Sequence, residues 1–244
     1  MNGLESAFIG DAATAAHIGE RLSALEAPKL LRFVVEDMFA GRIALVSSFG
    51  ADAAVLLHLV AQIDKNLPIL FVDTKQLFAE TLAYRDQLID LCGLTNVKTI
   101  EPDAERLARE DPENFLWAAD PDRCCALRKV EPLAKAMLPY DAWITGRKRF
   151  QSATRAALPI FEMDGERVKV NPLVRWTKSD VDDYVARHAL PRHELFAKGY
   201  FSIGCIPCTT KVRPGEDERA GRWRGRAKSE CGIHVAPLKV AAGD

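Results

Sequence analysis

Residues 43–63 read IALVSSFGADAAVLLHLVAQI, and this stretch decides the fold. It begins with an apolar run at 43–46, breaks in the small polar turn 47–52, and continues as an apolar helix from 53 to 63. The first run has the length of a buried strand, and the second has the length of a helix. The stretch therefore predicts a strand, a turn and a helix in succession.

The same alternation continues on both sides of this stretch. Apolar residues recur at helical spacing over residues 14–40, 78–91, 104–110 and 123–138. Short apolar runs typical of strands lie at 69–72, 97–100 and 142–145. Strands that alternate with helices predict a doubly wound, mostly parallel α/β sheet, in which ligands bind beyond the carboxyl ends of the strands.

Two further signals follow this alternation. Residues 161–163 and 168–170 predict an antiparallel pair across an Asp-Gly turn at 164–165. Thr177 is expected to cap the helix that follows. Periodicity is lost after residue 190, so we expect an irregular C-terminal segment there.

The net charge of −1 over 244 residues hides an uneven distribution. Residues 1–122 carry 10 Lys or Arg and 20 Asp or Glu, whereas residues 123–244 carry 23 and 14. The positive second half indicates that an anion binds there. It lacks the interleaved aromatic and basic residues of RNA-binding proteins, so a small anion is favoured over nucleic acid.

The sequence also indicates where the protein works. Residues 1–19 lack the basic stretch and apolar core of a secretory signal. No apolar run reaches the ~18 residues needed to span a bilayer. We therefore expect a cytoplasmic protein without membrane association, and leave self-association as a homo-oligomer open.

The turn 47–52, SSFGAD, lies between a strand and a helix. A small polar turn at a helix N-terminus offers backbone N–H groups to a phosphate. It matches neither the P-loop nor the dinucleotide-binding fingerprint. The turn alone is weak evidence, since many strand-to-helix turns are small and polar.

Four of the six cysteines form two pairs, Cys124-Cys125 and Cys205/Cys208. Two thiolate pairs suit a tetrahedral metal site or an iron–sulfur cluster. Adjacent cysteines bind one zinc ion only with backbone strain, but they can bind two irons of one cluster. Cys92 fits a buried structural thiol.

Cys231 lies in a basic tail without a nearby resolving cysteine. Neighbouring positive charge lowers the pKa of a thiol and makes it nucleophilic. A group attached to Cys231 must then be released by a thiol from another molecule.

The chain resembles the assimilatory adenylyl-sulfate reductases, the cluster-containing branch of the phosphoadenylyl-sulfate reductase family. The resemblance covers about residues 40–234 and includes the turn 47–52, FVDT at 71–74, ET at 80–81, CCALRK at 124–129, TGRKR at 145–149, QS at 151–152, NPL at 171–173, Trp176, GY at 199–200, SIGC at 202–205, PCT at 207–209, PGEDERAGRW at 214–223 and ECGIH at 230–234.

This resemblance implies an oxidoreductase with an adenine-nucleotide domain related to the ATP pyrophosphatases over residues 1–190, including N-terminal helices, and a C-terminal segment over 191–244. The implied reaction reduces adenosine 5′-phosphosulfate to sulfite and AMP through an S-sulfocysteine on Cys231. Thioredoxin would be the electron donor, in sulfate assimilation and cysteine biosynthesis.

The resemblance also implies roles for individual residues. A four-iron four-sulfur (4Fe-4S) cluster would be held by Cys124, Cys125, Cys205 and Cys208. The implied substrate-binding residues are Ser47, Gly50, Asp73, Thr74, Lys129, Gly146, Arg155, Arg219, Arg222 and His234.

The chain departs from the family pattern at three positions. Lys75 stands where the family usually has glycine, and Phe150 and Arg175 stand where it usually has aspartate. Three alternatives remain: a reductase for the 3′-phosphorylated nucleotide, a tRNA-thiolating enzyme with a cluster or zinc, and a non-catalytic nucleotide sensor with a structural metal. The two cysteine pairs weigh against the first, because such reductases generally lack them. The absence of an RNA-binding signal weighs against the second, and the reactive Cys231 weighs against the third.

Overall fold

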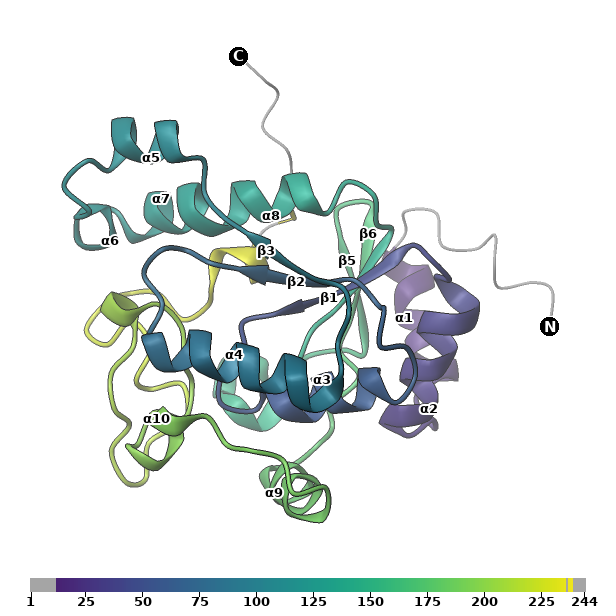
Figure 1. The fold of residues 1–244 in the computed structure, drawn as a ribbon. Helices are drawn as coiled ribbons and strands as arrows, with labels where there is room; N and C mark the ends of the chain where they lie inside the picture. The colour runs from purple at the N-terminus through teal and green to yellow at the C-terminus, as the bar shows by residue number, and fades with distance from the viewer. Residues whose placement is uncertain (1–11, 236, 239–244) are drawn as a thin grey trace.

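The central sheet has six strands among residues 12–235 and 237–238, which this computed structural model describes (Figure 1). Its strands are β1 (Ile43–Ser47), β2 (Ile69–Val72), β3 (Val97–Ile100), β4 (Ala142–Ile144), β5 (Phe161–Asp164) and β6 (Arg167–Val170). Their order is β3-β2-β1-β4-β6-β5, and every pair is parallel except β5 with β6. The predicted mostly parallel sheet is confirmed.

The central strands β1, β2 and β4 are buried on both faces. Leu45 and Ile144 face one core, while their neighbours Ala44 and Trp143 face another. Successive strand residues point to opposite faces, so each strand joins two layers of the molecule. This explains why the strands read as continuous apolar runs instead of alternating patterns.

Helices cover one face of the sheet with the larger core. They are α1 (Ala12–Arg21), α2 (Ala27–Arg32), the π-helical turn η1 (Phe33–Met38), α3 (Ala53–Ala61), α4 (Ala79–Cys92) and α9 (Lys178–Arg187). The continuous helical pattern expected over 14–40 is thus divided into three elements. Pro28 explains the start of α2, because proline fits the first turn of a helix but not its interior. At the sheet's edge, α1 packs against β5.

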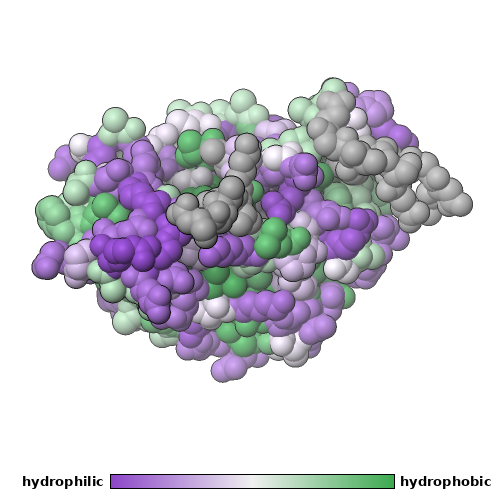
Figure 2. All heavy atoms as spheres, turned by 90° about the horizontal axis from the view of Figure 1, so that it is seen from above, coloured by the Kyte–Doolittle hydropathy of each residue, from purple (hydrophilic) through white to green (hydrophobic). Residues whose placement is uncertain are grey.

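The opposite face carries α5 (Ala104–Glu110), α6 (Leu116–Ala119), α7 (Pro121–Cys125), the π-helical turn η2 (Ala126–Val130) and α8 (Glu131–Ala136). Seen from this side, the region over α5 and α7 is strongly hydrophilic (Figure 2). An ion-pair cluster of Arg106, Arg123, Glu110 and Glu131 lies there. It links α5 and α7 to α8, and so fixes the helical turn that carries Cys124 and Cys125.

The hairpin and the helix cap agree with the sequence. The turn between β5 and β6 has Gly165 at φ 65°, a conformation that glycine adopts without strain. The hydroxyl of Thr177 accepts a hydrogen bond from the backbone N–H of Asp180, and the Asp180 carboxylate accepts one from Thr177 in return. This capping box sets the start of α9.

The C-terminal segment has little regular structure. Its short elements are α10 (Glu194–Ala197), η5 (Ile206–Cys208) and η6 (Gly232–His234); two more 3₁₀ turns, η3 (Arg149–Gln151) and η4 (Ala153–Arg155), precede it. In the described part of the chain, no helix has the length and apolar character needed to cross a membrane.

Trp223 is the centre of the C-terminal segment. Its side chain is 3% exposed, and the guanidinium of Arg222 lies 4.3 Å from the ring centroid. Arg219 and Lys228 also approach the ring, at 5.7 and 5.8 Å. Stacking of cations on an aromatic face is favourable, and more so when water is excluded. The indole of Trp223 therefore holds Arg219, Arg222 and Lys228 close together.

Candidate active site

A cavity of about 200 Å³ lies at the carboxyl ends of β1 and β4, between the sheet and the C-terminal segment. Eight of the ten sequence-predicted substrate-binding residues line it: Ser47, Gly50, Lys129, Gly146, Arg155, Arg219, Arg222 and His234. Cys231 lines it as well. The topology thus brings together residues that are separated by up to 187 positions in the sequence.

The turn after β1 forms the floor of this cavity. The hydroxyl of Ser47 accepts a hydrogen bond from the backbone N–H of Phe49 at 3.1 Å. Phe49 adopts φ 47° and is fully buried with its ring edge-on to Phe71. A Cβ at Gly50 would lie 3.4 Å from the carbonyl oxygen of Ile203, so a larger residue would crowd the C-terminal segment. The apolar Phe49 anchors the turn from below and leaves its polar groups at the cavity.

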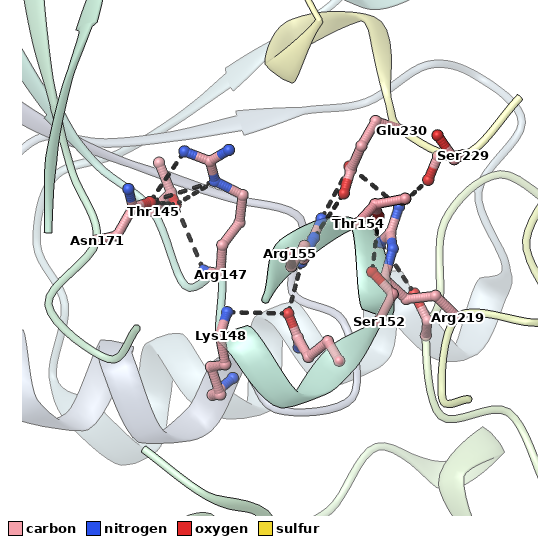
Figure 3. Close-up of polar contacts among 12 residues, drawn as sticks. Thr145, Arg147, Lys148, Ser152, Thr154, Arg155, Asn171, Arg219, Ser229 and Glu230 are labelled. Carbon is pink, nitrogen blue, oxygen red and sulfur yellow. Dashed lines mark hydrogen bonds and ion pairs between the residues drawn. The ribbon is translucent and has the colours of Figure 1, made fainter. Parts of the chain in front are cut away.

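The loop after β4 supplies buried cations. The ammonium of Lys148 lies 3.2 Å from the carboxylate of Asp52, which also lines the cavity. The guanidinium of Arg147 donates to Asn171 (Figure 3). It also pairs with Glu162. Burial, followed by the nearby charge of Arg155, lowers the pKa of Arg147. An anion in the cavity would stabilise this costly charge.

Glu230 holds two arginines of the cavity in place (Figure 3). Its carboxylate accepts from Arg155 Nε at 2.6 Å and from Arg219 Nη2 at 3.1 Å. Burial opposes ionisation of Glu230, but the two arginines outweigh it and lower the pKa of the carboxyl. Burial also lowers the pKa of Arg219, to about 9. The pair of arginines is therefore preorganised but not fully neutralised.

The half-buried Cys231 lies beside Lys129 and Arg222 on the cavity wall. Interaction with the Cys125 thiol lowers the pKa of Cys231, and the charges of Lys129 and Arg222 act in the same direction. Burial lowers the pKa of Lys129, but the nearby thiolates of Cys231 and Cys205 raise it overall. Cys231 is thus suited to react as a thiolate.

Glycines allow the C-terminal segment to approach the site closely. A Cβ at Gly204 would overlap the guanidinium of Arg222, and one at Gly221 would overlap the carbonyl oxygen of Thr210. Arg222 Nε donates to the carbonyl of Cys208 at 3.2 Å. This contact ties Arg222 to the turn that carries the Cys205/Cys208 pair.

Three of the four predicted ligand cysteines, Cys124, Cys205 and Cys208, interact beside this wall, whereas Cys125 interacts with Cys231. Burial raises the pKa of Cys124 to about 11, and the thiolates of Cys205 and Cys208 also raise it. Thr74 Oγ1 lies 3.1 Å from the sulfur of Cys205. Soft, mutually repelling thiolates fit an iron–sulfur cluster, whose irons would neutralise them.

The positions of the described His, Cys, Asp and Glu side chains limit the kinds of metal site. Among the residues that the structure describes, no group of three or more His, Cys, Asp or Glu is arranged to hold a single metal ion. A single zinc ion needs its four ligands at about 2.0–2.3 Å from one centre. The cluster of the four cysteines stays a prediction.

Two predicted substrate-binding residues, Asp73 and Thr74, lie outside the cavity lining in the described chain. Asp73 accepts a hydrogen bond from the backbone N–H of Lys75 at 2.8 Å. Thr74 is buried, and its carbonyl accepts from Arg128. Both residues lie in the loop after β2, which contacts Cys205 through the hydroxyl of Thr74.

The three departures from the family pattern also lie outside the described cavity lining. Lys75 has a φ of 60°, a conformation that glycine adopts without strain, which explains why glycine is usual at this position. The Lys75 ammonium pairs with Glu101 at 2.5 Å. Phe150 packs against the larger core. Arg175 donates to the carbonyl of Ser23 between α1 and α2.

Sequence reasoning did not assign roles to Asp52, Lys148, Gln151 and Glu230. Gln151 accepts from Arg155 Nη1 at 2.5 Å, so it belongs to the same network. Lys148, Gln151 and Glu230 stand in the motifs quoted above, but their spacing gave no sign of a shared site.

Comparison with known proteins places this geometry in context. A family model described as phosphoadenosine phosphosulfate reductase domain matches residues 42–211. An adenosine 5′-phosphosulfate reductase from Mesorhizobium japonicum is 52% identical over 96% of this chain and 92% of the relative. A relative of the same name from Rhodococcus opacus is 38% identical over 96% and 98%.

Solved structures show a related architecture. A phosphoadenylyl-sulfate reductase from Candida auris, in a phosphate complex, is 26% identical with a TM-score of 0.71, over 83% of this chain and 98% of that one. A Candida glabrata FMN adenylyltransferase is similar in fold alone, with a TM-score of 0.52 and 16% identity over 96% and 90%.

Proposed function

The chain belongs to the phosphoadenosine phosphosulfate reductase family, and we propose that it reduces adenosine 5′-phosphosulfate to sulfite and AMP in sulfate assimilation and cysteine biosynthesis. The position of Cys231, on a cavity wall beside Lys129 and Arg222, carries this proposal. The names of the 52% and 38% identical relatives support the substrate.

In the first step the Cys231 thiolate attacks the sulfur of the phosphosulfate. A bond forms between the two sulfurs, the bond from sulfur to the bridging oxygen breaks, and AMP leaves with its electron pair. Lys129, Arg219 and Arg222 stand along the cavity wall, where they would stabilise the negative charge that develops on the phosphate. The product is an S-sulfocysteine.

In the second step a thiolate of thioredoxin attacks the Cys231 sulfur. Sulfite leaves with the electron pair of the sulfur–sulfur bond, and the second thioredoxin thiol resolves the mixed disulfide. Both electrons come from the dithiol, so the protein need not shuttle them. A four-iron four-sulfur cluster on Cys124, Cys125, Cys205 and Cys208 would supply an electrostatic and positioning contribution beside Lys129.

The decisive experiment compares the unmodified protein with Cys231→Ser after purification without oxygen. Sulfite release is measured with thioredoxin and with each nucleotide, with and without the 3′-phosphate, alongside an iron and sulfide assay. We expect the variant to keep about four irons per chain and to release no sulfite. Cys92→Ala, which removes a thiol in α4 away from the cavity, serves as the control and should retain activity.

Other outcomes have defined meanings. Normal turnover by Cys231→Ser would remove the proposed nucleophile. Preference for the 3′-phosphorylated nucleotide would make the chain a reductase of that substrate. Protein containing zinc and releasing no sulfite would favour a tRNA-thiolating enzyme or a nucleotide sensor.

A further inference from the structure

The chain returns to the sheet soon after Cys231. Ile233 packs against the smaller core, on the face that carries Trp143. The ring of His234 stacks on Trp143 with centroids 5.8 Å apart and planes within 4°. Leu238 is 3% exposed and belongs to the same core. The tail thus places two apolar residues, Ile233 and Leu238, on the sheet within seven positions of the nucleophile.

One carboxylate connects this tail to the sheet. Asp164, the last residue of β5, is 2% exposed. Its Oδ2 accepts from the indole Nε1 of Trp143 at 2.9 Å, and its Oδ1 accepts from the backbone N–H of Leu238 at 3.1 Å. Arg167 donates to the carbonyl of Leu238 at 3.4 Å. Lys169 is the charged group nearest to Asp164, at 4.0 Å.

The cost of burying Asp164 makes this arrangement informative. A buried carboxylate is tolerated only where donors and a cation compensate its lost hydration. Here one of the two close donors comes from the tail, so the carboxylate is fully satisfied only when the tail is docked.

We propose that Asp164 is a positioning residue, and that Trp143, Asp164 and Leu238 form a tail anchor that holds Cys231 at the cavity. This rests on the function proposed above. Attack on the substrate needs Cys231 at the cavity wall, whereas a thioredoxin-sized protein cannot enter a cavity of about 200 Å³. The tail anchor therefore sets the balance between a docked tail, which faces the substrate, and a released tail, which faces the outside dithiol.

The anchor is tested by the rate at which iodoacetamide alkylates Cys231 in the anaerobically purified protein. The modified peptide is quantified by mass spectrometry, so the other cysteines do not interfere. Rates are recorded from pH 6 to pH 10, because a thiol released from its charged neighbours has a pKa of about 8.5 and reaches its plateau only above that pH. The plateau reports access to the sulfur separately from the thiolate fraction. Leu238→Ala and Asp164→Asn weaken the anchor from its two sides.

Val235→Ala is the matched control, because it truncates an aliphatic side chain in the same tail that is 70% exposed. We expect the plateau rate to rise at least tenfold in Leu238→Ala and in Asp164→Asn, and to stay within twofold in Val235→Ala. AMP should slow alkylation of the unmodified protein more than that of Leu238→Ala, since a filled cavity favours the docked tail. If Asp164→Asn does not fold, Leu238→Ala still tests the anchor, because it changes no residue of the sheet.

Activity provides a second readout. Leu238→Ala should lower kcat/KM for the nucleotide, while the rate at which dithiol releases sulfite from preformed S-sulfocysteine stays the same or rises. An unchanged plateau rate in Leu238→Ala would overturn the anchor, whatever the activity. Turnover by Cys231→Ser would overturn the proposed function instead, so the two failures are distinguishable.

Discussion

The sheet region, residues 43–170, and the C-terminal segment, residues 191–238, are stabilised in different ways. In the sheet region, apolar side chains from strands and helices form two continuous cores. In the C-terminal segment, cations stack on Trp223 and side chains donate to backbone carbonyls, as Arg222 does to Cys208. The first region supplies a rigid frame together with Lys129 and Arg155, and the second supplies Cys231, Arg219 and Arg222.

This difference has a physical consequence. Apolar burial is insensitive to direction, whereas cation stacking and hydrogen bonds require defined geometry. The C-terminal segment can therefore place charges accurately around an anion, while its apolar contacts are confined to a small cluster around Leu195 and Ile203 and to Leu238 in the smaller core. We expect its local stability to be lower than that of the sheet region.

Trp223→Ala should have the largest effect, and it should be confined to one region. Loss of a buried tryptophan costs about 3–5 kcal/mol, which we expect as lost protection of residues 200–231 in hydrogen exchange. Sulfite release should fall at least tenfold. Trp223→Phe keeps an aromatic face and should be intermediate. Equal loss of protection in β1 and β2 would show that the two regions unfold together.

Leu88→Ala should produce the reverse pattern. Leu88 is fully buried in α4 against the sheet, and its truncation should lower the global free energy of unfolding by about 3 kcal/mol. Denaturant unfolding measures this loss. Leu91→Ala, in the same helix but 54% exposed, should change it by less than about 0.5 kcal/mol. Similar losses in both variants would contradict the assigned core.

Acid should loosen the junction between the regions through His193. Burial lowers the pKa of this imidazole to about 4 from 6.5. Its Nδ1 accepts from the backbone N–H of Leu195, and its Nε2 lies 3.0 Å from Thr81 Oγ1. The neutral ring is therefore the form that fits the fold.

Stability should be full above pH 6.5 and decrease as the pH falls toward 4, because the unfolded chain then binds the extra proton. Between pH 6.5 and pH 5 we expect a loss of up to about 2 kcal/mol. His193→Asn keeps an acceptor for the cap and should remove this part of the pH dependence, as measured by denaturant unfolding. An identical pH profile in the variant would exclude His193 as the cause.

Lys75→Gly should have the smallest effect and the opposite sign. The left-handed φ of 60° is unfavourable for lysine, while glycine adds unfolded-state entropy. We expect a net stabilisation of about 0.5 kcal/mol, measured by thermal unfolding. Lys75→Ala removes the Glu101 ion pair without relieving the backbone, and should not stabilise the protein.

The same two regions differ in how far the sequence predicts them. The strands β2 and β3 agree with their predicted ranges to the residue, and α5 does as well. Their boundaries coincide with changes in apolar pattern, which is local information. The helix expected over 123–138 is present as α7, η2 and α8, with a π-helical turn at 126–130 that the apolar pattern did not predict.

The sequence predicted site residues only where they stand in a motif shared with the family. The cavity brings together Cys231, Lys129 and Arg222 as the family resemblance implies. The bridge of Glu230 between Arg155 and Arg219 could not be read, since it joins residues 75 and 11 positions apart. The same holds for Asp164, whose partners Trp143 and Leu238 lie 21 and 74 positions away.

The contact of α1 with β5 has a consequence for self-association. β5 ends the sheet, and an uncovered edge strand offers unpaired N–H and C=O groups to another chain. Gly19 of α1 lies close to Phe161, since a Cβ there would be 3.7 Å from its ring. The amino-terminal helix thus shields the end of the sheet. A chain shortened beyond Arg21 would expose that edge and gain a route to aggregation through strand pairing.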